Sequence, residues 1–479
     1  RSGDNKLILV DESGCPVNFT IDRQPDFHST IKQKNGSINY YPNGAYAYPS
    51  TGRSEKIEIN SDGSYVLYKP NGSKIFFTFY GQLDRIVDLH NNAIIFSYNN
   101  NHQLDTIKDD YGRVTTFTYD GSRIKKILDP LNRKVVYGYN SDGILTSVTD
   151  IDDDTIKYEY TAGNNCLAKI IKPDNSFISI KYGEVRQDGS YIATSTKHEE
   201  QGETDSGEVF EFDFTNRVTR YTNHSGVQTT YWYDTNNRTI REQSNDGSVI
   251  EYTYDPVTGF LTSEKRNSDP IFYINDSRGN RISAAYSDGS KESWTWNELN
   301  QNETYIDRDG IIIRKIYENG NCVSISKGSV CIFSGRYDVK GRLISSTDGN
   351  QAEVNYTYDA YGSISTKSLV CDAGTIQDKW EYDIIGRKIA YTDGSGRIWK
   401  CQYQNKSVTE ISPTSLERIY TYNNRKDIQS IKEIDTQTNE ERTTLFYYDK
   451  RHLLIKKTTP AGIDTLYEYR DDGKLSSVI

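Results

Sequence analysis

The chain has no methionine and only 11 prolines among its 479 residues. No run of 18 apolar residues occurs, so the sequence predicts no transmembrane helix. Hydrophobic residues make up 35% of the chain, which is too few for the aliphatic core of one large compact domain. The first residue is not methionine and the N-terminal stretch lacks a signal-peptide apolar segment, so we expect a fragment or a processed chain.

Neither the cysteines nor the charged residues form a pattern that would indicate a specific ligand. The six cysteines form no C-x-x-C pair, which argues against a zinc site and against a dense disulfide framework. We expect them to be buried or half-buried thiols: Cys15, Cys166, Cys322, Cys331, Cys371 and Cys401. The net charge is −10, from 57 basic and 67 acidic residues without a basic stripe, so no nucleic-acid partner is expected.

Tyrosine is the abundant residue, with 38 copies. A tyrosine ring suits a pleated sheet surface because its ring packs while its hydroxyl group reaches water or a polar partner. Thr, Ser, Asn, Asp and Gly are also frequent, which is typical of many strands joined by tight turns.

An internal repeat dominates the sequence. Segments such as "RYDVKGRLISSTDGN" (336–350) and "EYDIIGRKIAYTDGS" (381–395) align on the tyrosine of Tyr-Asp, which we call the anchor. Eighteen anchors follow one another, mostly 21 residues apart: Tyr98, Tyr119, Tyr139, Tyr160, Tyr182, Phe212, Tyr233, Tyr254, Asn275, Trp296, Tyr317, Tyr337, Tyr358, Tyr382, Tyr403, Tyr422, Tyr448 and Tyr469. Such a period over about 370 residues indicates a repeat array.

Each repeat reads as two short strands and two turns. The residues before the anchor alternate with period 2, and Asp-x-x-Gly after it predicts a type I turn closed by a left-handed glycine. Asn216 and Asn237 stand where glycine is expected, and asparagine tolerates the same conformation. The residues we assign to this structural motif are Tyr119, Asp120, Tyr233, Asp234, Tyr254, Asp255, Tyr337, Asp338, Gly341, Arg342, Tyr358, Asp359, Gly362, Tyr382, Asp383, Gly386, Arg387, Tyr448 and Asp449.

Eighteen such units predict an all-β fold, a long antiparallel sheet of repeated hairpins. A sheet of this length must twist and curl, so we expect it to wind into a hollow spiral shell. Residues 1–78 are out of phase with the repeat and predict a β lead-in that caps the edge of the sheet, and residues 79–479 form the array. The long steps predict an insertion at 183–211, as a projecting hairpin or loop, and a longer hairpin between Tyr422 and Tyr448.

The pattern Tyr-x-Tyr-Asp-x-x-Gly-Arg-Leu, seen around Tyr337, Tyr358 and Tyr382, resembles the YD repeat of RHS-type proteins. The lead-in "LVDESGCPVNFTI" resembles the segment before the first repeats of that family. The resemblance implies a large hollow β-shell, as in bacterial polymorphic toxins, toxin-complex shells and animal teneurins. In the toxins the shell encloses a C-terminal toxic domain that a pair of aspartates in a core motif cuts free.

The resemblance leads us to expect a non-enzymatic, encapsulating shell of a bacterial protein that is secreted or displayed at the cell surface. Its partners would be a C-terminal toxin cargo or a second shell-forming protein, together with secretion-system components, and it would need no cofactor. The alternative is an adhesion module in which Trp294, Trp296, Trp380 and Trp399 stack on glycans, although an anchor such as Trp296 is better explained by strand packing. A third hypothesis, a cell-wall hydrolase, finds no constellation of catalytic residues.

The segment "YTYDPVTGFLTSEKRNSDP" (252–270) contains two Asp-Pro steps, at Asp255 and Asp269, which could be a self-cleaving acid pair. Asp255 follows an anchor, however, and ten further repeats come after it, so we interpret both as turn residues. The acidic run at 150–155 lacks the glycine and final glutamate of an EF-hand and predicts surface charge. The six scattered histidines predict solvated loop residues: His28, His90, His102, His198, His224 and His452.

Overall fold

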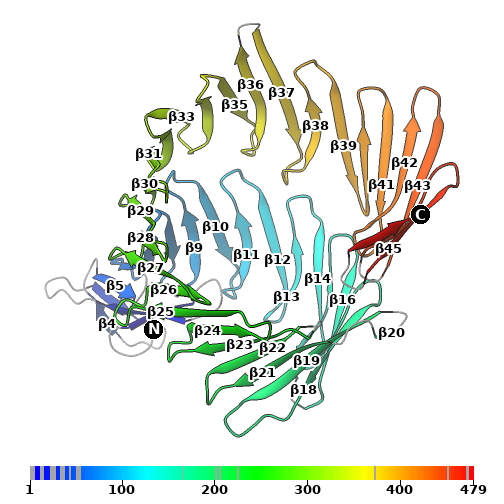
Figure 1. Cartoon of the computed structure of the whole chain (residues 1–479). Coiled ribbons are helices and arrows are strands. Elements are labelled where there is room, and N and C mark those ends of the chain that lie inside the picture. The colour runs from blue at the N-terminus through cyan, green and yellow to red at the C-terminus, as the bar shows by residue number, and fades with distance from the viewer. Residues whose placement is uncertain are drawn as a thin grey trace. The chain divides into compact units, whose positions relative to one another are not determined.

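The computed structural model confirms that the fold is an all-β array of antiparallel hairpins (Figure 1). It describes residues 6–10, 16–21, 29–32, 38–41, 45–49, 55–163, 165–199, 202–203, 207–223, 226–371, 374–449, 452–470 and 474–479. Within these ranges there are 46 strands and no α-helix, hence no helix that could cross a membrane. The chain divides into two compact units, one of residues 1–114, 212–220 and 227–354, the other of residues 115–211, 221–226 and 355–479.

The strands follow the chain in order. Those of the first half are β1 (Lys6–Val10), β2 (Pro16–Ile21), β3 (Ser29–Lys32), β4 (Ile38–Tyr41), β5 (Ala45–Pro49), β6 (Lys56–Ile59), β7 (Tyr65–Tyr68), β8 (Lys74–Phe77), β9 (Leu83–Val87), β10 (Ala93–Tyr98), β11 (Leu104–Lys108), β12 (Val114–Asp120), β13 (Arg123–Leu128), β14 (Lys134–Tyr139), β15 (Leu145–Thr149), β16 (Thr155–Tyr160), β17 (Leu167–Ile171), β18 (Phe177–Tyr182), β19 (Tyr191–Glu199), β20 (Gly202–Glu203), β21 (Glu208–Asp213), β22 (Val218–Thr222) and β23 (Gln228–Tyr233). The remainder are β24 (Thr239–Ser244), β25 (Val249–Tyr254), β26 (Leu261–Arg266), β27 (Asp269–Asn275), β28 (Arg281–Tyr286), β29 (Lys291–Trp296), β30 (Asn302–Ile306), β31 (Ile312–Glu318), β32 (Asn321–Lys327), β33 (Val330–Tyr337), β34 (Leu343–Asp348), β35 (Glu353–Tyr358), β36 (Ile364–Cys371), β37 (Gly374–Tyr382), β38 (Lys388–Thr392), β39 (Ile398–Gln404), β40 (Ser407–Ile411), β41 (Leu416–Tyr422), β42 (Ile428–Asp435), β43 (Glu440–Tyr448), β44 (Leu454–Thr458), β45 (Asp464–Tyr469) and β46 (Leu475–Val478).

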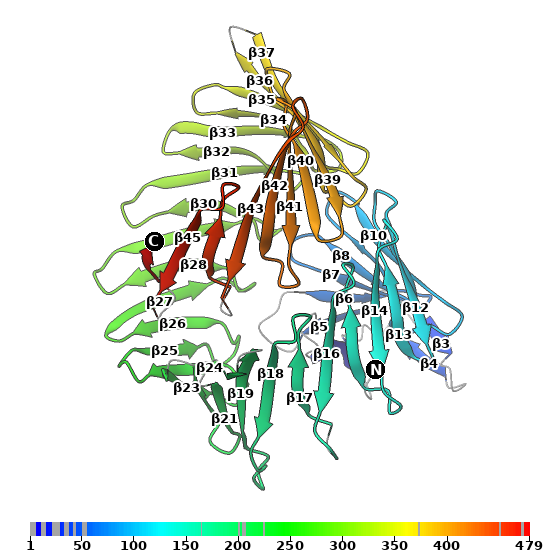
Figure 2. The same ribbon diagram turned by 90° about the vertical axis from the view of Figure 1, so that its right-hand side faces the viewer.

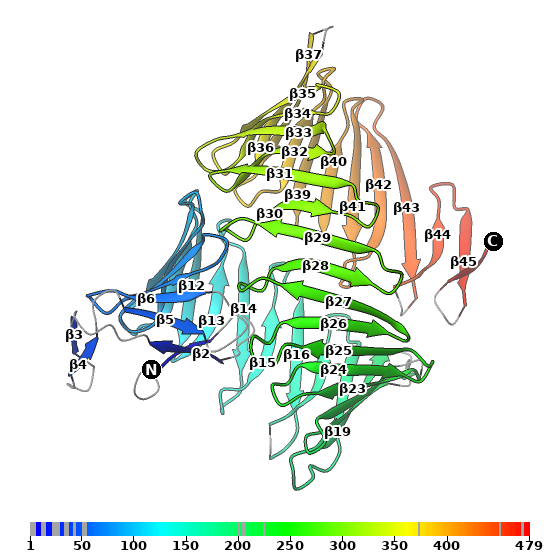
Figure 3. The ribbon, with the colours of Figure 1, turned by 60° about the vertical axis from the view of Figure 1, so that its left-hand side comes forward.

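Consecutive strands pair with one another within each unit. In the first unit β23 to β34 form an unbroken antiparallel series, which Figure 3 shows as a ladder of strands. In the second unit β36 to β46 do the same, with β39 to β43 side by side in Figure 2. The longer hairpin predicted between Tyr422 and Tyr448 is confirmed as β42 and β43, and the 183–211 segment contains β19, which pairs with β18.

The buried core lies mainly in the lead-in segment. Of the ten hydrophobic residues that are buried among those described, seven precede residue 78. Six of them form one cluster, Leu7, Phe19, Ile57, Ile59, Tyr65 and Leu67, and the seventh is Val66. Here β2 pairs with β5 rather than β3, so the β3–β4 hairpin stands outside this ladder. The array itself is mostly half-buried, and the division at residue 78 stays a prediction.

The turn after the anchor has the predicted geometry. The Asp338 N–H donates to Arg342 O at 2.9 Å, and the Gly341 N–H donates to Asp338 O at 3.0 Å. Gly341 has φ +76°, in the left-handed region that a glycine adopts without strain. Asn237 takes the same conformation (φ 59°), as predicted. The prediction for Asn216 is wrong, because the turn there is one residue longer and Arg217 is left-handed instead (φ 53°).

Most anchors lie where the strand register shifts by one residue, whereas Tyr182 and Tyr403 pair without such a shift. At Tyr337, for example, the register changes between Arg336 and Tyr337, so that Tyr337 faces Leu343. Such a bulge leaves one extra residue on the second strand and increases the local twist. The same irregularity occurs at the motif anchors Tyr119, Tyr233, Tyr254, Tyr382 and Tyr448.

The polar end of the anchor side chain reaches back to the preceding hairpin. Tyr337 Oη donates to the carbonyl of Cys322 at 2.8 Å, 15 residues earlier. The same bond to residue i−15, at 2.7 to 3.1 Å, is described for ten anchors: Tyr98, Tyr139, Tyr160, Tyr182, Tyr254, Trp296 (through Nε1), Tyr317, Tyr337, Tyr403 and Tyr469. The anchor therefore ties each repeat to its predecessor.

We predict that Tyr337→Phe loosens its own pair of hairpins while the fold persists. Loss of one part-buried hydrogen bond costs about 1 kcal/mol, which corresponds to roughly 5-fold faster exchange of nearby amide hydrogens through local opening. Hydrogen exchange over residues 321–348 measures this. Tyr80→Phe is the matched control, since that side chain is 61% exposed. Equal effects of the two variants would contradict a structural role of the anchor hydroxyl group.

Candidate functional site

The aspartates of the repeat motif serve as turn clamps. Asp338 Oδ1 accepts from the N–H groups of Lys340 and Arg342, both at 2.9 Å, and Oδ2 accepts from Arg342 Nε at 2.7 Å. Partial burial acts to raise the pKa of Asp338, but the Arg342 N–H and guanidinium outweigh it and lower the pKa. A carboxylate so held is a fixed anion and a poor proton donor.

The other motif aspartates show variations on this clamp. Asp234 and Asp383 each bind the guanidinium four residues ahead, from Arg238 and Arg387, at 2.7 Å. Asp359 and Asp449 accept backbone N–H bonds, in turns that contain Gly362 (φ +81°) and His452 (φ +64°). Gly386 is also left-handed (φ +85°). Asp120 differs because it pairs directly with Arg123 across a two-residue turn, and its side chain is exposed.

The proposed acid pair is not assembled. Asp255 Oδ1 accepts from the N–H groups of Val257 and Thr258, and these bonds lower the pKa of Asp255. Asp269 pairs with Arg266 at the other end of β26, whereas Asp255 precedes the start of that strand. Six strand residues at about 3.3 Å each put the two carboxylates on the order of 20 Å apart. They therefore cannot share a proton.

In the first unit, turns far apart in the sequence lie against one another. Asn92 Nδ2 donates to Lys340 O at 3.0 Å, and Lys340 Nζ forms an ion pair with Asp110. The His90 ring lies so close to Gly341 that a Cβ there would be 2.5 Å from it. The interpretation of His90 as a solvated loop residue is therefore wrong, since its Nε2 is buried.

This contact borders a hollow within the first unit. It measures about 1020 Å³, and the loop of Leu89 and His90 forms one wall while the anchors Tyr317 and Tyr337 form another. Leu89 packs against Gly320, where a Cβ would be 1.8 Å from its side chain. The hollow thus lies between an early turn and the anchor turns of later repeats.

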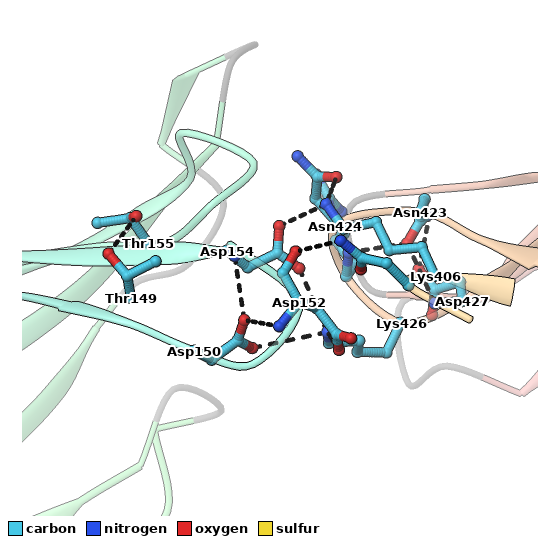
Figure 4. Close-up of polar contacts among 12 residues, drawn as sticks. Thr149, Asp150, Asp152, Asp154, Thr155, Lys406, Asn423, Asn424, Lys426 and Asp427 are labelled. Atoms are coloured by element: carbon cyan, nitrogen blue, oxygen red, sulfur yellow. Dashed lines mark hydrogen bonds and ion pairs between the residues drawn. The ribbon is translucent and has the colours of Figure 1, made fainter. Parts of the chain in front are cut away.

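The second unit contains a matching contact, made of charged residues (Figure 4). Lys406 Nζ donates to Asp154 Oδ1 at 2.6 Å, and Lys426 Nζ lies 2.5 Å from Asp152 Oδ2 and 3.2 Å from Asp154 Oδ2. The Asp154 side chain is only 5% exposed, so its interpretation as surface charge is wrong. Burial acts to raise its pKa, but the two lysines outweigh this and lower it.

The two contacts share their geometry, and we call each of them a seam. In both, the turn that follows an anchor meets a turn at the opposite end of earlier hairpins. The hydrogen-bonded partners are 230 and 248 residues apart in the first unit, and 252 to 274 in the second. These separations correspond to eleven to thirteen repeats of 21 residues.

The remaining candidate residues are the cysteines and the histidines. The cysteines described are free, and Cys331 and Cys371 are exposed, contrary to the prediction of buried thiols. No cluster of three or more metal-ligating side chains occurs within the described ranges. His452 Nδ1 lies 3.1 Å from Asp427. Cys15, His28 and His224 lie outside the described residues, as does the side chain of His198.

Three of the four tryptophans considered for glycan binding, Trp294, Trp380 and Trp399, are part of cross-strand stacks. Trp294 stacks on Tyr305 with ring centroids 5.5 Å apart, and Tyr391 stacks between Trp380 and Trp399 at 5.6 and 5.4 Å. One face of each of these rings is therefore occupied by a neighbour. Glycan binding stays a prediction.

Comparison with known proteins identifies the repeat. Residues 122–258 match the family described as Teneurin YD-shell, which confirms the resemblance to YD-repeat proteins. A search of curated proteins found no match. Solved structures with similarity include a mutant Photorhabdus luminescens Tc holotoxin pore (10% identity, 99% of this chain and 34% of that chain, TM-score 0.43) and TcdB2-TccC3-TEV (11% identity, 97% and 31%, TM-score 0.38). The chain spans about a third of the length of those chains.

We predict that the double variant Lys406→Met/Lys426→Met opens the seam of the second unit. It leaves the Asp154 carboxylate without its cations, at a cost of about 1 to 3 kcal/mol, so amides at 150–155 and 423–427 exchange faster. Lys432→Met removes an exposed pair with Glu441 and serves as control. An unchanged exchange rate at both turns would show that the lysines do not hold the seam.

The same seam gives a pH dependence. Because the Asp154 pKa is lowered in the fold, its contribution is present above the unfolded pKa of about 3.9 and is lost as pH falls below it. The protection factors at 150–155, which are corrected for the pH dependence of intrinsic amide exchange, should thus fall between pH 5 and pH 3 in the unmodified protein and fall much less in the double variant. A parallel response of both proteins would contradict the assignment.

We also predict that Asp255→Asn and Asp269→Asn leave the chain uncut and folded, because the two carboxylates lie at opposite ends of β26 and cannot act together. Intact-protein mass spectrometry of the purified protein and both variants measures this. A fragment that appears only when both aspartates are present would contradict the turn interpretation.

Proposed function

We propose that this YD-repeat protein is a non-enzymatic β-shell of a secreted bacterial toxin or delivery protein, and that it encloses a polypeptide cargo. The observation that carries the proposal is the common sequence separation at the two seams. A strip of hairpins whose edges meet every eleven to thirteen repeats would wind as a spiral, with about two strands per repeat.

The chemistry of the strip supports an enclosing role. Its residues are mostly half-buried rather than packed into a second layer, and the aspartates of the motif are committed to turns. A wall of this kind needs no apolar filling, because each sheet residue is held by backbone pairing and by the anchor bond to its predecessor. The interior would then be free for another chain.

The cargo would be a C-terminal toxin segment, with a second shell-forming protein and secretion-system components as further partners. The support for these assignments is the family resemblance. The contacts that the described residues do specify are those of the seams, where lysine and aspartate turns join one edge of the strip to another.

The proposal predicts a hollow particle when the protein is expressed from its complete reading frame. Electron microscopy should reveal a thin wall around a cavity, and a cargo segment should resist protease until the seams are opened by the Lys406→Met/Lys426→Met substitutions. Two sheets packed face to face around a filled core, or a cargo digested at the same rate in both proteins, would refute the shell.

A further inference from the structure

One anchor of the array has lost its ring. Fifteen of the eighteen anchors are tyrosine and two are Phe212 and Trp296, but the ninth is Asn275. The register shift between Ile274 and Asn275 places it firmly at the anchor position. The ring that every other repeat carries there is therefore missing from this one.

Asn275 nevertheless keeps the anchor hydrogen bond. Its Nδ2 donates to Leu261 O at 2.9 Å, and Leu261 is the residue that faces the preceding anchor, Tyr254. Tyr254 itself donates to the equivalent carbonyl, that of Thr239, which faces Tyr233. The amide thus replaces the phenol as donor without replacing its volume.

A hollow of about 510 Å³ lies at this position. Residues of the preceding hairpin and of the next one line it, and they include Phe260, Leu261, Asn275, Arg281, Trp294 and Trp296. In other repeats the anchor ring occupies the equivalent space, between the preceding hairpin and the next anchor. The residues around this hollow therefore stand where residues of other repeats surround a tyrosine ring.

A second change favours an aromatic occupant. In three ring-bearing repeats an arginine 16 residues before the anchor lies over its ring, as Arg238 does over Tyr254 at 4.5 Å and Arg387 over Tyr403 at 4.4 Å. The equivalent residue before Leu261 is Phe260, which packs against Gly279, where a Cβ would be 2.8 Å from its ring. Phe260 thus places an aromatic ring beside the hollow where other repeats have a charged guanidinium group.

We infer that the hollow at Asn275 binds an aromatic side chain of tyrosine type, presented by another polypeptide. Phe260 and Trp296 would contact the faces of the ring, and the Asn275 amide oxygen and the Leu261 carbonyl would accept its hydroxyl proton, since a carbonyl oxygen has two lone pairs. The inference does not depend on the shell proposal.

The test uses 4-methylphenol, the side chain of tyrosine, as the probe. Saturation-transfer NMR on the whole chain should detect binding with Kd on the order of 1 mM, as expected for so small a ligand. The saturated analogue 4-methylcyclohexanol should bind at least about 10-fold more weakly, because it lacks the flat face that the ring walls fit. Equal binding of the two probes, or binding of methyl glucoside in their place, would overturn the aromatic assignment.

Two variants locate the site. Asn275→Tyr restores the usual anchor and should abolish 4-methylphenol binding, while exchange of the β27–β28 amides slows. Phe260→Arg restores the usual arginine and should weaken binding several-fold without touching the anchor bond, so it serves if Asn275→Tyr misfolds. Binding that survives both substitutions would place the probe elsewhere and refute the inference.

Discussion

The hydrogen bond from the anchor to the carbonyl 15 residues earlier is the interaction on which the array depends. Because the anchor ends the first strand of its hairpin and its acceptor lies at the start of the second strand of the previous hairpin, the bond is made only when successive repeats keep their spacing. A bulge lies at most anchors, for example at Tyr254 and Tyr337, and increases the twist there, although Tyr182 and Tyr403 lack it. Period, twist and the half-buried aromatic face thus have one common origin.

At the seam of the first unit, different residues of one turn have different roles. Asp338 and Gly341 fix the shape of their turn, and the variable residue between them, Lys340, makes the remote contact through its side chain and its carbonyl. The seam of the second unit uses Lys406 and Lys426, which instead occupy the left-handed position of their turns (φ 53° and 67°), the position that Gly341 holds in the first unit. The lysine that makes the remote contact therefore stands at a different turn position in the two seams.

Sequence reasoning recovers what is local. The hairpin, the left-handed glycine and the turn role of Asp255 follow from residues within a few positions of one another, and the structure has them. It misses what is remote: Asp154 reads as surface charge because its lysines are more than 250 residues away. The error at Asn216 is of another kind, because adding one residue to a turn moves the left-handed position to Arg217 and no pattern of residue types marks that change.

In a repeat array most positions are constrained by packing and pairing. A residue that departs from the repeat therefore indicates a separate role only if the strand pairing and the anchor hydrogen bond are kept. At Asn275 both are kept: the amide still donates to the carbonyl of Leu261, whereas alanine or glycine would have lost both the ring and the bond. The neighbouring replacement of arginine by Phe260 would be unfavourable beside an ordinary anchor, because it forfeits the cation over the ring. Asn275 and Phe260 together leave a space beside aromatic rings while the strand pairing and the anchor hydrogen bond are kept. A structural repeat can contain a binding site in this way.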